Sequence, residues 1–487
     1  MLGLISFGYI EYNVSYLELV PQMSCNINGT EYSSCTEEMV CQGTNKPQAN
    51  YTFVYEDNTS LHNWVAQLDL LCVPGFRLGL LGSMYFAGWA STVLIVPTMA
   101  DKTGRKFWFV ISTFLTFCTM IGFMLSRRLN LTIGLMFLAG AANSGRVMVG
   151  FVFGQEFLVP YWQVVFGICF HFIDNATCIL TSFYFDFINN QYLYVAAVGA
   201  FWGLLAVIIS LFFAPESPLW ELKMGRVYKA QITLHKMMKM NGVDCSLEID
   251  NLDEKVREIN QALQNAPHIE QTEDGAIRES EAYTGRRSVF QATEEEQKSV
   301  MFYLRQSVVF KNVCIMAYMW AMCSFCYYMI VFYLKYLPGD IYSNTFASSG
   351  TDCLSVVTSG IIYKKLGVRK TFTFLLIFSV IGSLLIIFFG EKNEAFMPFF
   401  VVVAKWGISG SFIVVYISMV DIFPTLFLAT AFGMCNFLAR VLTIVAPQVA
   451  ELEPPVPMIV FCGLALGGCV MANFVTPLKQ QVIDTVK

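Results

Sequence analysis

The chain has 487 residues, of which 55% are hydrophobic and only 14% are charged. Soluble domains carry roughly a quarter charged residues. A soluble core of this size does not need so many apolar side chains, so the excess is expected to face lipid. The formal net charge of -5 offers no basic surface for nucleic acid, and 4 histidines with 15 scattered cysteines leave little room for a metal cluster. The composition excludes a soluble enzyme, a disordered chain and a fibrous protein.

Apolar segments recur along the whole chain at the length that crosses a bilayer, which is about 20 mostly apolar residues. The first segment, residues 1–22, is interrupted by Glu11 and Glu18, so we expect a helix that is short or truncated at Met1. Further segments divide between residues 76–214, with helices two to six, and residues 312–476, with helices seven to twelve. The eleven segments after the first are 76–99, 107–125, 131–154, 163–184, 193–214, 312–334, 343–363, 371–390, 396–420, 424–447 and 456–476.

Two short basic loops orient the chain. Residues 101–106 and 364–370 are both net basic, and they lie on the same side of the membrane if every helix crosses once. The positive-inside rule makes that side cytoplasmic, although the arginine pair at 127–128 favours the opposite orientation. We therefore expect residues 23–75 to form an extracellular loop.

This predicted outer loop contains three glycosylation sequons and four cysteines. The sequons predict glycosylation, and the alternative is that such short patterns arise by chance. Their acceptor residues are Asn28, Asn50 and Asn58. In an oxidising compartment the cysteines are expected to form two disulfides in any of three pairings. They are Cys25, Cys35, Cys41 and Cys72. Sequons and cysteines together favour the secretory route and the plasma membrane.

A long polar insertion, residues 215–311, divides the apolar segments six and six. The orientation places it in the cytoplasm, together with the tail at 477–487. Residues 250–263 carry apolar side chains at helical spacing and predict a short amphipathic helix. Residues 264–300 are acidic and poor in apolar side chains, so we expect much of this stretch to be mobile.

Several motifs narrow the fold. Residues 99–106 (MADKTGRK) follow the second helix and resemble the inner-loop signature of the major facilitator superfamily. Residues 215–220 (PESPLW) resemble the PESPRW element of solute carrier family 22, the organic cation, anion and zwitterion transporters, with Leu219 in place of arginine. Residues 421–425 (DIFPT) resemble that family's acid-x-x-Pro-Thr element. The resemblance covers nearly the whole chain and implies the major facilitator fold, with twelve transmembrane helices in two six-helix halves.

The resemblance also implies an inner gate, because an aspartate and two basic groups at a tight glycine turn can clamp neighbouring helix ends. The gating residues that it implies are Asp101, Gly104, Arg105, Glu156, Glu216, Arg226 and Asp421. The second copy of the signature, residues 363–370, lacks its aspartate, and arginines typical of the family are missing after Glu156 and after Thr425. Fewer ion pairs between the halves favour a rival interpretation. A transporter-like protein that no longer transports would serve as a receptor, or as a subunit with protein partners.

Ionisable side chains inside the membrane are costly and usually face a cavity or a partner. The candidates are Arg146, Asp174, Asp352, Lys405 and Arg440. Lys405 and Lys335 lie near helix ends, where snorkelling to the interface is the alternative to a binding role. Arg146 stands where relatives commonly have an uncharged residue, so it is either a second anion contact or a partner of Asp174.

Arg440 is the most informative of these residues. Residues 439–447 resemble the eleventh helix of the family's anion-transporting branch, in which an arginine stands seven residues before a proline. A guanidinium binds a carboxylate or sulfate with two parallel hydrogen bonds and repels an ammonium group. The alternative is a structural ion pair with Asp352 or Asp421. The lysine that anion carriers often have in helix eight is replaced by Val356, although Asp352 matches an acidic place there.

An aromatic stretch in the seventh helix supports the anion branch. Residues 320–328 (WAMCSFCYY) look like that branch's WFxxSxxYY pattern. Aromatic rings give a pocket rigid apolar walls with polar tips, although packing and lipid contact are the more common roles of such residues. The aromatic residues that match the family are Trp320, Tyr327, Tyr328, Phe170, Phe412 and Tyr416.

These features predict a secondary transporter of small organic ions, most simply organic anions, that works by alternating access. The expected partners are a small organic ion and the lipid bilayer, with a counter-ion if transport occurs by exchange, and no nucleic acid. No Walker loop and no catalytic triad is apparent, so we expect neither a pump nor an enzyme, and no cofactor or metal. The alternatives are a transport-inactive receptor or subunit, and a transporter of organic cations or carnitine-like zwitterions.

Overall fold

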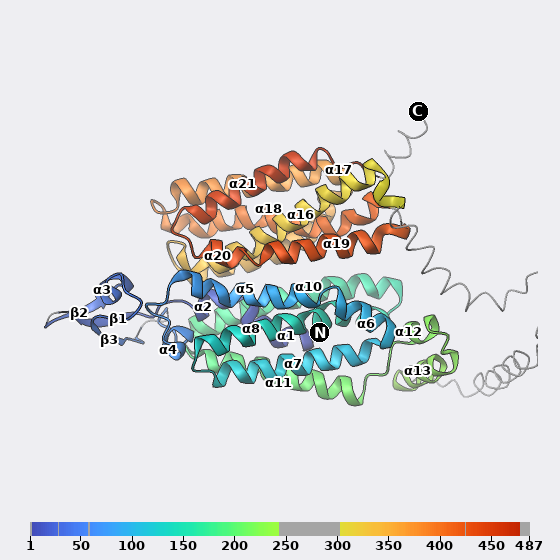
Figure 1. The fold of residues 1–487 in the computed structure, drawn as a ribbon, viewed down its shortest axis with the longest axis horizontal. Coiled ribbons are helices and arrows are strands. Elements are labelled where there is room, and N and C mark those ends of the chain that lie inside the picture. Colours follow the sequence, from blue (N-terminus) through green and yellow to red (C-terminus); the bar gives the residue numbers. More distant parts are fainter. Residues whose placement is uncertain (1, 28, 57–58, 243–301, 424, 478–487) are drawn as a thin grey trace, which may run out of the picture.

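The computed structural model describes residues 2–27, 29–56, 59–242, 302–423 and 425–477. The predicted amphipathic helix at 250–263 and the predicted mobile stretch lie outside these residues, as do Asn28 and Asn58. Two layers of long helices lie side by side, one formed by the first half of the chain and the other by the second half (Figure 1). Each half packs mainly on itself, as in the contacts of α5 with α8 and of α17 with α18.

The first half contains four helices of 18 or more residues, α5, α7, α10 and α11, together with several shorter helices. Its elements are α1 (Leu2–Glu11), α2 (Val14–Leu17), α5 (Gly75–Thr92), α6 (Ile95–Thr103), α7 (Arg105–Leu125), α8 (Leu129–Asn143), η1 (Ser144–Val149), α9 (Gly150–Gln155), α10 (Pro160–Phe187) and α11 (Tyr192–Phe212). Two further helices, α12 (Pro218–Lys223) and α13 (Val227–Met240), follow the last of these. The segment η1 is a π-helix that interrupts the fourth predicted span. Such bulges are frequent at functional sites.

The second half has longer helices. Its elements are α16 (Ser307–Tyr333), η2 (Leu334–Tyr336), α17 (Ile341–Phe389), η3 (Glu394–Phe396), α18 (Met397–Ile422), α19 (Thr425–Thr443), α20 (Ala446–Ala450) and α21 (Val456–Ala472). The 49-residue α17 is two helices joined at Gly367, where φ is 70° and the backbone leaves the helical region. Glycine tolerates this left-handed conformation because it has no Cβ.

Eight helices of the described residues are long and apolar enough to cross a membrane, or nine if α5 and α6, which meet at 40°, form one bent span. The predicted twelve would require three further spans. Counting the two parts of α17 separately adds one span, the short α1 with α2 adds a second, and the 17-residue α21 adds a third. The helical membrane-protein class is confirmed, whereas the count of twelve remains a prediction.

The loop between α2 and α5 contains structure that an all-α prediction omits. It forms a three-stranded antiparallel sheet in the order β2-β1-β3, from β1 (Met23–Ile27), β2 (Thr30–Cys35) and β3 (Asn50–Phe53). Two short helices, α3 (Glu37–Cys41) and α4 (Trp64–Leu68), accompany the sheet. Disulfides join Cys25 to Cys35 and Cys41 to Cys72, which selects one of the three possible pairings. We call this end of the molecule the sheet end and the opposite end, with α12 and α13, the α13 end (Figure 1).

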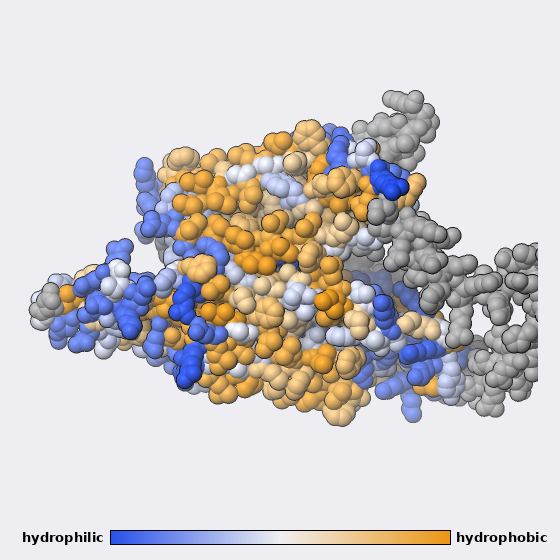
Figure 2. Space-filling view, in the orientation of Figure 1, coloured by the Kyte–Doolittle hydropathy of each residue, from blue (hydrophilic) through white to orange (hydrophobic). Residues whose placement is uncertain are grey.

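Large apolar side chains cover the outside of the helical body. Figure 2 shows a broad hydrophobic belt across both layers, with hydrophilic residues concentrated at the two ends. Phe201, Phe388 and Phe399 are each about 60% exposed, whereas a soluble protein buries most such side chains. A belt of this kind is expected where lipid replaces water, since helices satisfy all their backbone hydrogen bonds internally.

Candidate functional site

Arg440 lies in α19 and is 2% exposed. Its guanidinium carbon is 3.6 Å from the centre of the Trp89 ring of α5, in the other half of the molecule, and 6.0 Å from that of Tyr328. One terminal nitrogen donates to Ser324 Oγ at 3.4 Å, while Nε has no hydrogen-bond partner among the residues that the structure describes. Over the described ranges no carboxylate lies within 4.0 Å of this side chain, so it is not paired with Asp352 or Asp421.

Asp352 pairs instead with Lys405 of α18, whose Nζ lies 3.6 Å from Asp352 Oδ2. Lys405 is fully buried and does not snorkel, and its Nζ sits 3.7 Å from the centre of the Tyr327 ring. The Asp352 carboxylate accepts hydrogen bonds from Tyr327 OH at 3.0 Å and from Ser409 Oγ. This arrangement brings α16, α17 and α18 together around one neutral charge pair.

Arg146 also has a buried acidic partner, which is Glu11 of α1. Its Nη2 lies 3.6 Å from Glu11 Oε2, Nη1 donates to Gly3 O at 3.2 Å, and Nη2 also donates to Asn143. The π-helix η1 carries Arg146 into this position. The other predicted acid, Asp174 of α10, accepts a 2.7 Å hydrogen bond from Tyr12 OH.

Five of the six predicted aromatic residues form one cluster, which we call the aromatic wall. Its members are Trp320, Tyr327, Tyr328, Phe412 and Tyr416, with neighbouring ring centres 4.7 to 5.7 Å apart. Phe170 packs apart from this cluster, against Phe151 and Phe166. No sequence pattern indicated a role for Trp89 or the burial of Lys405, because the packing of distant helices brings both side chains to the aromatic wall.

A cavity of about 10 Å³ lies between the halves beside Asp352. Its lining comes from Tyr12, directly after α1, and α10 of the first half and from α16, η2 and α17 of the second. It includes Asn175, Cys178, Ser348 and Ser349. That volume is close to the minimum for one water molecule. A solute can enter only when the halves move apart.

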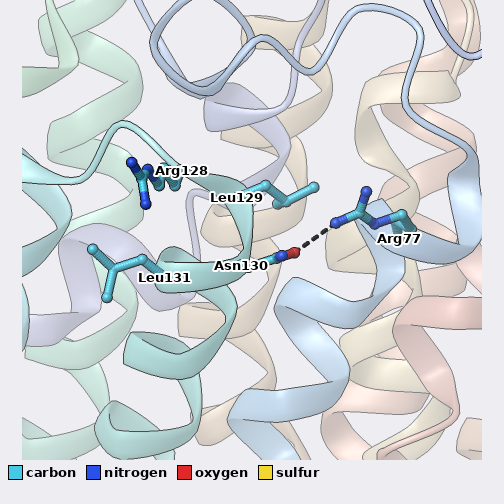
Figure 3. Close-up of a pocket in the computed structure, with 5 residues that line it drawn as sticks. All are labelled: Arg77, Arg128, Leu129, Asn130 and Leu131. Carbon is cyan, nitrogen blue, oxygen red and sulfur yellow. Dashed lines mark hydrogen bonds between the residues drawn. The ribbon is translucent and has the colours of Figure 1, made fainter.

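A larger hollow of about 490 Å³ lies at the starts of α5 and α8. Figure 3 shows Arg77, Arg128 and Asn130 around it, and Arg77 Nη2 donates to Asn130 Oδ1 at 2.6 Å. Leu129 and Leu131 complete the lining. None of these residues belongs to the aromatic wall or contacts Arg440.

The predicted gating residues of the inner-loop signature form one cluster within the first half. Arg105 binds Glu156 Oε2 at 2.9 Å and Asp101 Oδ1 at 3.0 Å. Glu216 Oε1 accepts from the backbone N–H groups of Arg105 and Lys106, each at 3.0 Å. A carboxylate at a helix N-terminus satisfies otherwise unpaired donors and suits the helix dipole. The cluster therefore ties α12 and α9 to the start of α7.

One more predicted gating residue, Arg226, lies close to this cluster, and another, Asp421, lies in the other half. Trp220 Nε1 donates to Asp101 O at 2.7 Å, and the guanidinium of Arg226 lies 5.0 Å from the Trp220 ring centre. Asp421, which is exposed, accepts a hydrogen bond from Tyr363 OH of the second signature copy. Across the parts that the structure describes, no ion pair joins the two halves at the α13 end.

The sheet end, in contrast, carries a buried charge cluster between the halves. Lys335 Nζ lies 2.5 Å from Glu18 Oε2 of the first half and 2.8 Å from Glu451 Oε1 of the second. Each of these side chains is at most 3% exposed, so Lys335 does not snorkel either. Tyr336 OH donates to Glu451 Oε2 at 2.7 Å. We call Glu18, Lys335 and Glu451 the lock.

Close backbone packing reinforces the lock. Ser83 Oγ of α5 donates to Ile444 O at 2.7 Å, and Gln448 Nε2 donates to Phe76 O at 3.2 Å. A Cβ added to Gly82 would lie 2.6 Å from both Phe332 and Pro447, so only glycine allows this approach. The structure therefore represents a state that is closed at the sheet end.

Solved structures share this fold. The partially occluded inward-open xylose transporter XylE from E. coli aligns with a TM-score of 0.61, covering 98% of this chain and 96% of that one at 12% identity. The inward-open form of the same transporter aligns with a TM-score of 0.60. The protein therefore has the major facilitator fold.

Curated relatives narrow the class, although no family model matches the chain. Solute carrier family 22 member 4 of Mus musculus is 23% identical over 445 residues, which cover 89% of this chain and 70% of that protein. Organic cation transporter 1 of Caenorhabditis elegans is 22% identical, covering 98% and 83%. Human organic cation/carnitine transporter 2 is 22% identical, covering 96% and 77%. The chain resembles solute carrier family 22 over most of its length, and these relatives are transporters, not enzymes.

Proposed function

We propose that this protein is a secondary transporter of small organic anions that works by alternating access. Secondary transport of a small organic solute is the part of this function that the fold and the relatives support directly. The preference for anions depends on one observation, which is that the buried guanidinium of Arg440 has no carboxylate partner within the described part of the chain.

A buried charge without a counter-charge is costly. Trp89 stabilises the guanidinium of Arg440 by a cation–π contact, and Ser324 accepts one long hydrogen bond, but neither supplies negative charge. An organic anion would supply that charge and would satisfy the donors that remain. The anion therefore gains more from this site than a neutral solute of the same shape.

The acidic residues of the same region argue in the same direction. Glu11 is neutralised by Arg146 and Asp352 by Lys405, so two of the carboxylates that would attract an organic cation already have basic partners. Asp174 accepts a hydrogen bond from Tyr12. Two of these three acids therefore have basic partners, whereas Arg440 has no described carboxylate within 4.0 Å and can attract a negatively charged solute.

The relatives favour a second candidate, because two of them are named as transporters of organic cations and one of these also of carnitine. The aromatic wall suits an ammonium group, which binds to ring faces. A carnitine-like zwitterion would place its carboxylate on Arg440 and its ammonium group on the wall. This candidate keeps the role of Arg440 and changes only the second contact.

A third candidate is a transport-inactive protein that acts as a receptor or as a subunit of a membrane assembly. The eroded second signature copy and the absence of ion pairs between the described parts of the halves at the α13 end favour it. An inner gate without ion pairs closes less firmly. Alternating access requires the gate at the α13 end to close whenever the sheet end opens.

We place the protein in the plasma membrane, with the sheet end outside and glycosylated. The disulfides at that end fit an oxidising compartment. The gating roles of Asp101, Glu216 and their neighbours belong to the same proposal, since their cluster braces one half so that it can move as a rigid body.

Uptake into proteoliposomes tests the proposal. Purified protein is reconstituted, and uptake of radiolabelled benzoate, carnitine and tetraethylammonium is compared. We expect saturable benzoate uptake that Arg440→Gln abolishes and Arg440→Lys partly retains, because lysine keeps the charge but not the planar fork. Carnitine uptake lost in Arg440→Gln would support the zwitterion candidate. Uptake of tetraethylammonium alone, or of no solute, would contradict the anion proposal.

A further inference from the structure

The lock contains more acidic groups than basic ones. Glu18 and Glu451 both approach the single ammonium group of Lys335, at 2.5 and 2.8 Å. All three side chains are at most 3% exposed. If both acids were ionised, one negative charge would remain uncompensated in a place that water hardly reaches. Burial of such a charge is costly, and an acid in this position normally becomes neutral by taking up a proton.

The two acids of the lock differ in how well their oxygens are satisfied. Both carboxylate oxygens of Glu451 accept hydrogen bonds, Oε1 from Lys335 Nζ at 2.8 Å and Oε2 from Tyr336 OH at 2.7 Å. Glu18 Oε2 accepts from Lys335 Nζ at 2.5 Å. Glu18 Oε1 is buried and has no hydrogen-bond partner among the residues that the structure describes. The lock therefore favours the ionised form of Glu451, and Glu18 Oε1 is the atom best placed to carry a proton.

The charges around the lock favour this assignment. Lys335, Glu451 and Tyr336 are the titratable groups that face Glu18 within the described part of the chain. One further acid, Glu37 of α3, interacts electrostatically with Lys335 and Glu451. Partial burial raises the pKa of the Glu37 carboxyl group above its usual value, and Lys335 acts in the opposite direction. Because Glu37 is exposed at the surface of the sheet unit, it is less in need of a proton than Glu18.

We infer that Glu18 binds a proton when the halves close at the sheet end and releases it to that side when they open. Opening brings water to Glu18, and a solvated glutamic acid is ionised above about pH 4.3. Closing removes that water, so the proton and the ammonium group of Lys335 together neutralise the two acids. The proton enters and leaves on the same side, so the lock senses acidity there and carries no proton across the membrane. This inference rests on the alternating access of the proposed function and not on its preference for anions.

The direction of the pH dependence follows from where the proton is bound. A proton that binds only the closed state favours that state when protons are abundant. Acidity on the sheet side therefore holds the sheet end shut, and the closed state loses this advantage as the pH rises. One linked proton changes the ratio of closed to open molecules by at most about ten-fold per pH unit.

Labelling of Cys178 at different pH values tests the inference, because this residue lines the small cavity between the halves. The full-length protein is placed in proteoliposomes with the sheet end outward, and a membrane-impermeant maleimide is added outside. Glu18→Gln is the reference variant, since its amide imitates a protonated acid. Each wild-type labelling rate is divided by the rate of Glu18→Gln at the same pH, which removes the intrinsic pH dependence of the thiol. We expect this ratio to rise at least ten-fold from about pH 5.5 to about pH 7.5.

A control variant and a second measurement separate the role of Glu18 from other effects. Glu37→Gln removes the exposed acid near Lys335 and should keep the wild-type pH dependence. Infrared spectroscopy detects the C=O band of a protonated carboxylic acid without any opening of the halves. Wild-type protein at neutral pH should show such a band, and Glu18→Gln should lack it.

The outcomes distinguish this inference from the function on which it rests. Labelling of Cys178 with a constant ratio would overturn the inference and leave alternating access intact. Loss of the pH dependence in Glu37→Gln would assign the proton to Glu37 and would also overturn it. Absence of the infrared band from wild-type protein would overturn it even if Glu18→Gln failed to fold. No labelling at any pH, in wild-type protein or in Lys335→Met, would contradict alternating access and the inference together.

Discussion

The guanidinium of Arg440 stacks on the indole ring of Trp89 at 3.6 Å, and the two residues belong to opposite halves of the molecule. One side chain thus both borders the aromatic wall and connects the layers that must move apart during transport. A substrate that binds Arg440 changes the contact between the halves. If Arg440 binds the substrate as proposed, binding and conformational change are coupled at this point.

Replacing Trp89 with leucine tests this coupling. The variant loses a cation–π contact worth about 1–2 kcal/mol in a desolvated site, so Arg440 is less well oriented. We expect KM for benzoate uptake to rise about ten-fold with a smaller change in the maximal rate. Trp162→Leu is the control, because Trp162 is 55% exposed on the outer surface. An unchanged KM in Trp89→Leu would show that Trp89 does not position Arg440.

The two disulfides should contribute unequally to the stability of the sheet unit. Cys41–Cys72 closes a sequence separation of 31 residues and Cys25–Cys35 one of 10. In the chain-entropy model, removing the longer loop costs roughly 1 kcal/mol more. Serine replacement of Cys41 and Cys72 should therefore make the sheet unit more sensitive to protease than serine replacement of Cys25 and Cys35. Equal cleavage rates would contradict the entropic account.

Sequence patterns predicted the parts of this fold that depend on lipid. The length of the apolar segments predicted the membrane-spanning helices, because the hydrocarbon core of a bilayer tolerates few charges over about 20 residues. The resemblance of residues 320–328 to the family's aromatic stretch predicted aromatic pocket walls, and α16 places Trp320, Tyr327 and Tyr328 in the aromatic wall. The sheet was missed because its three strands are short and lie among cysteines and turns.

Charge partners could not be predicted, because they depend on how distant helices pack. Lys335 and Lys405 looked like residues that snorkel, yet each is buried beside a carboxylate from another element. Arg146 was expected to pair with Asp174 or to bind substrate, and its acidic partner is Glu11 in the first helix. The sequence identified the costly residues correctly but carried no signal of which acid would neutralise which base.

Gly104 should tolerate alanine poorly. Its φ of 118° is a conformation that only glycine adopts easily, and an added Cβ would lie 2.6 Å from Glu216 Oε2. We expect Gly104→Ala to destabilise the protein by about 1–3 kcal/mol and to lower its Tm. Gly225→Ala is the matched control, since Gly225 also has a positive φ, of 69°, but meets no atom within 4 Å. A loss of stability no larger than in Gly225→Ala would show that the Glu216 contact adds nothing.

The lock makes the sharpest prediction about conformational change. Lys335→Met would leave Glu18 and Glu451 buried without their shared cation, and removal of one partner from a buried pair costs about 3–5 kcal/mol. The substitution destabilises the conformation that is closed at the sheet end, because only that conformation buries the two carboxylates. The halves should therefore open at the sheet end more often. Cys178 is a native reporter, because it lines the small cavity between the halves.

We expect a membrane-impermeant maleimide added on the sheet side to label Cys178 at least ten-fold faster in Lys335→Met, roughly the effect of 1.4 kcal/mol. Lys335→Arg keeps the charge and should stay close to wild type, and Cys178→Ser identifies the labelled residue. Lys392→Met removes an exposed lysine and should have no effect. A lower Tm with unchanged labelling would mean that the three residues brace the fold without controlling access. Faster labelling would establish that one ammonium group, shared by two carboxylates, holds this end of the transporter shut.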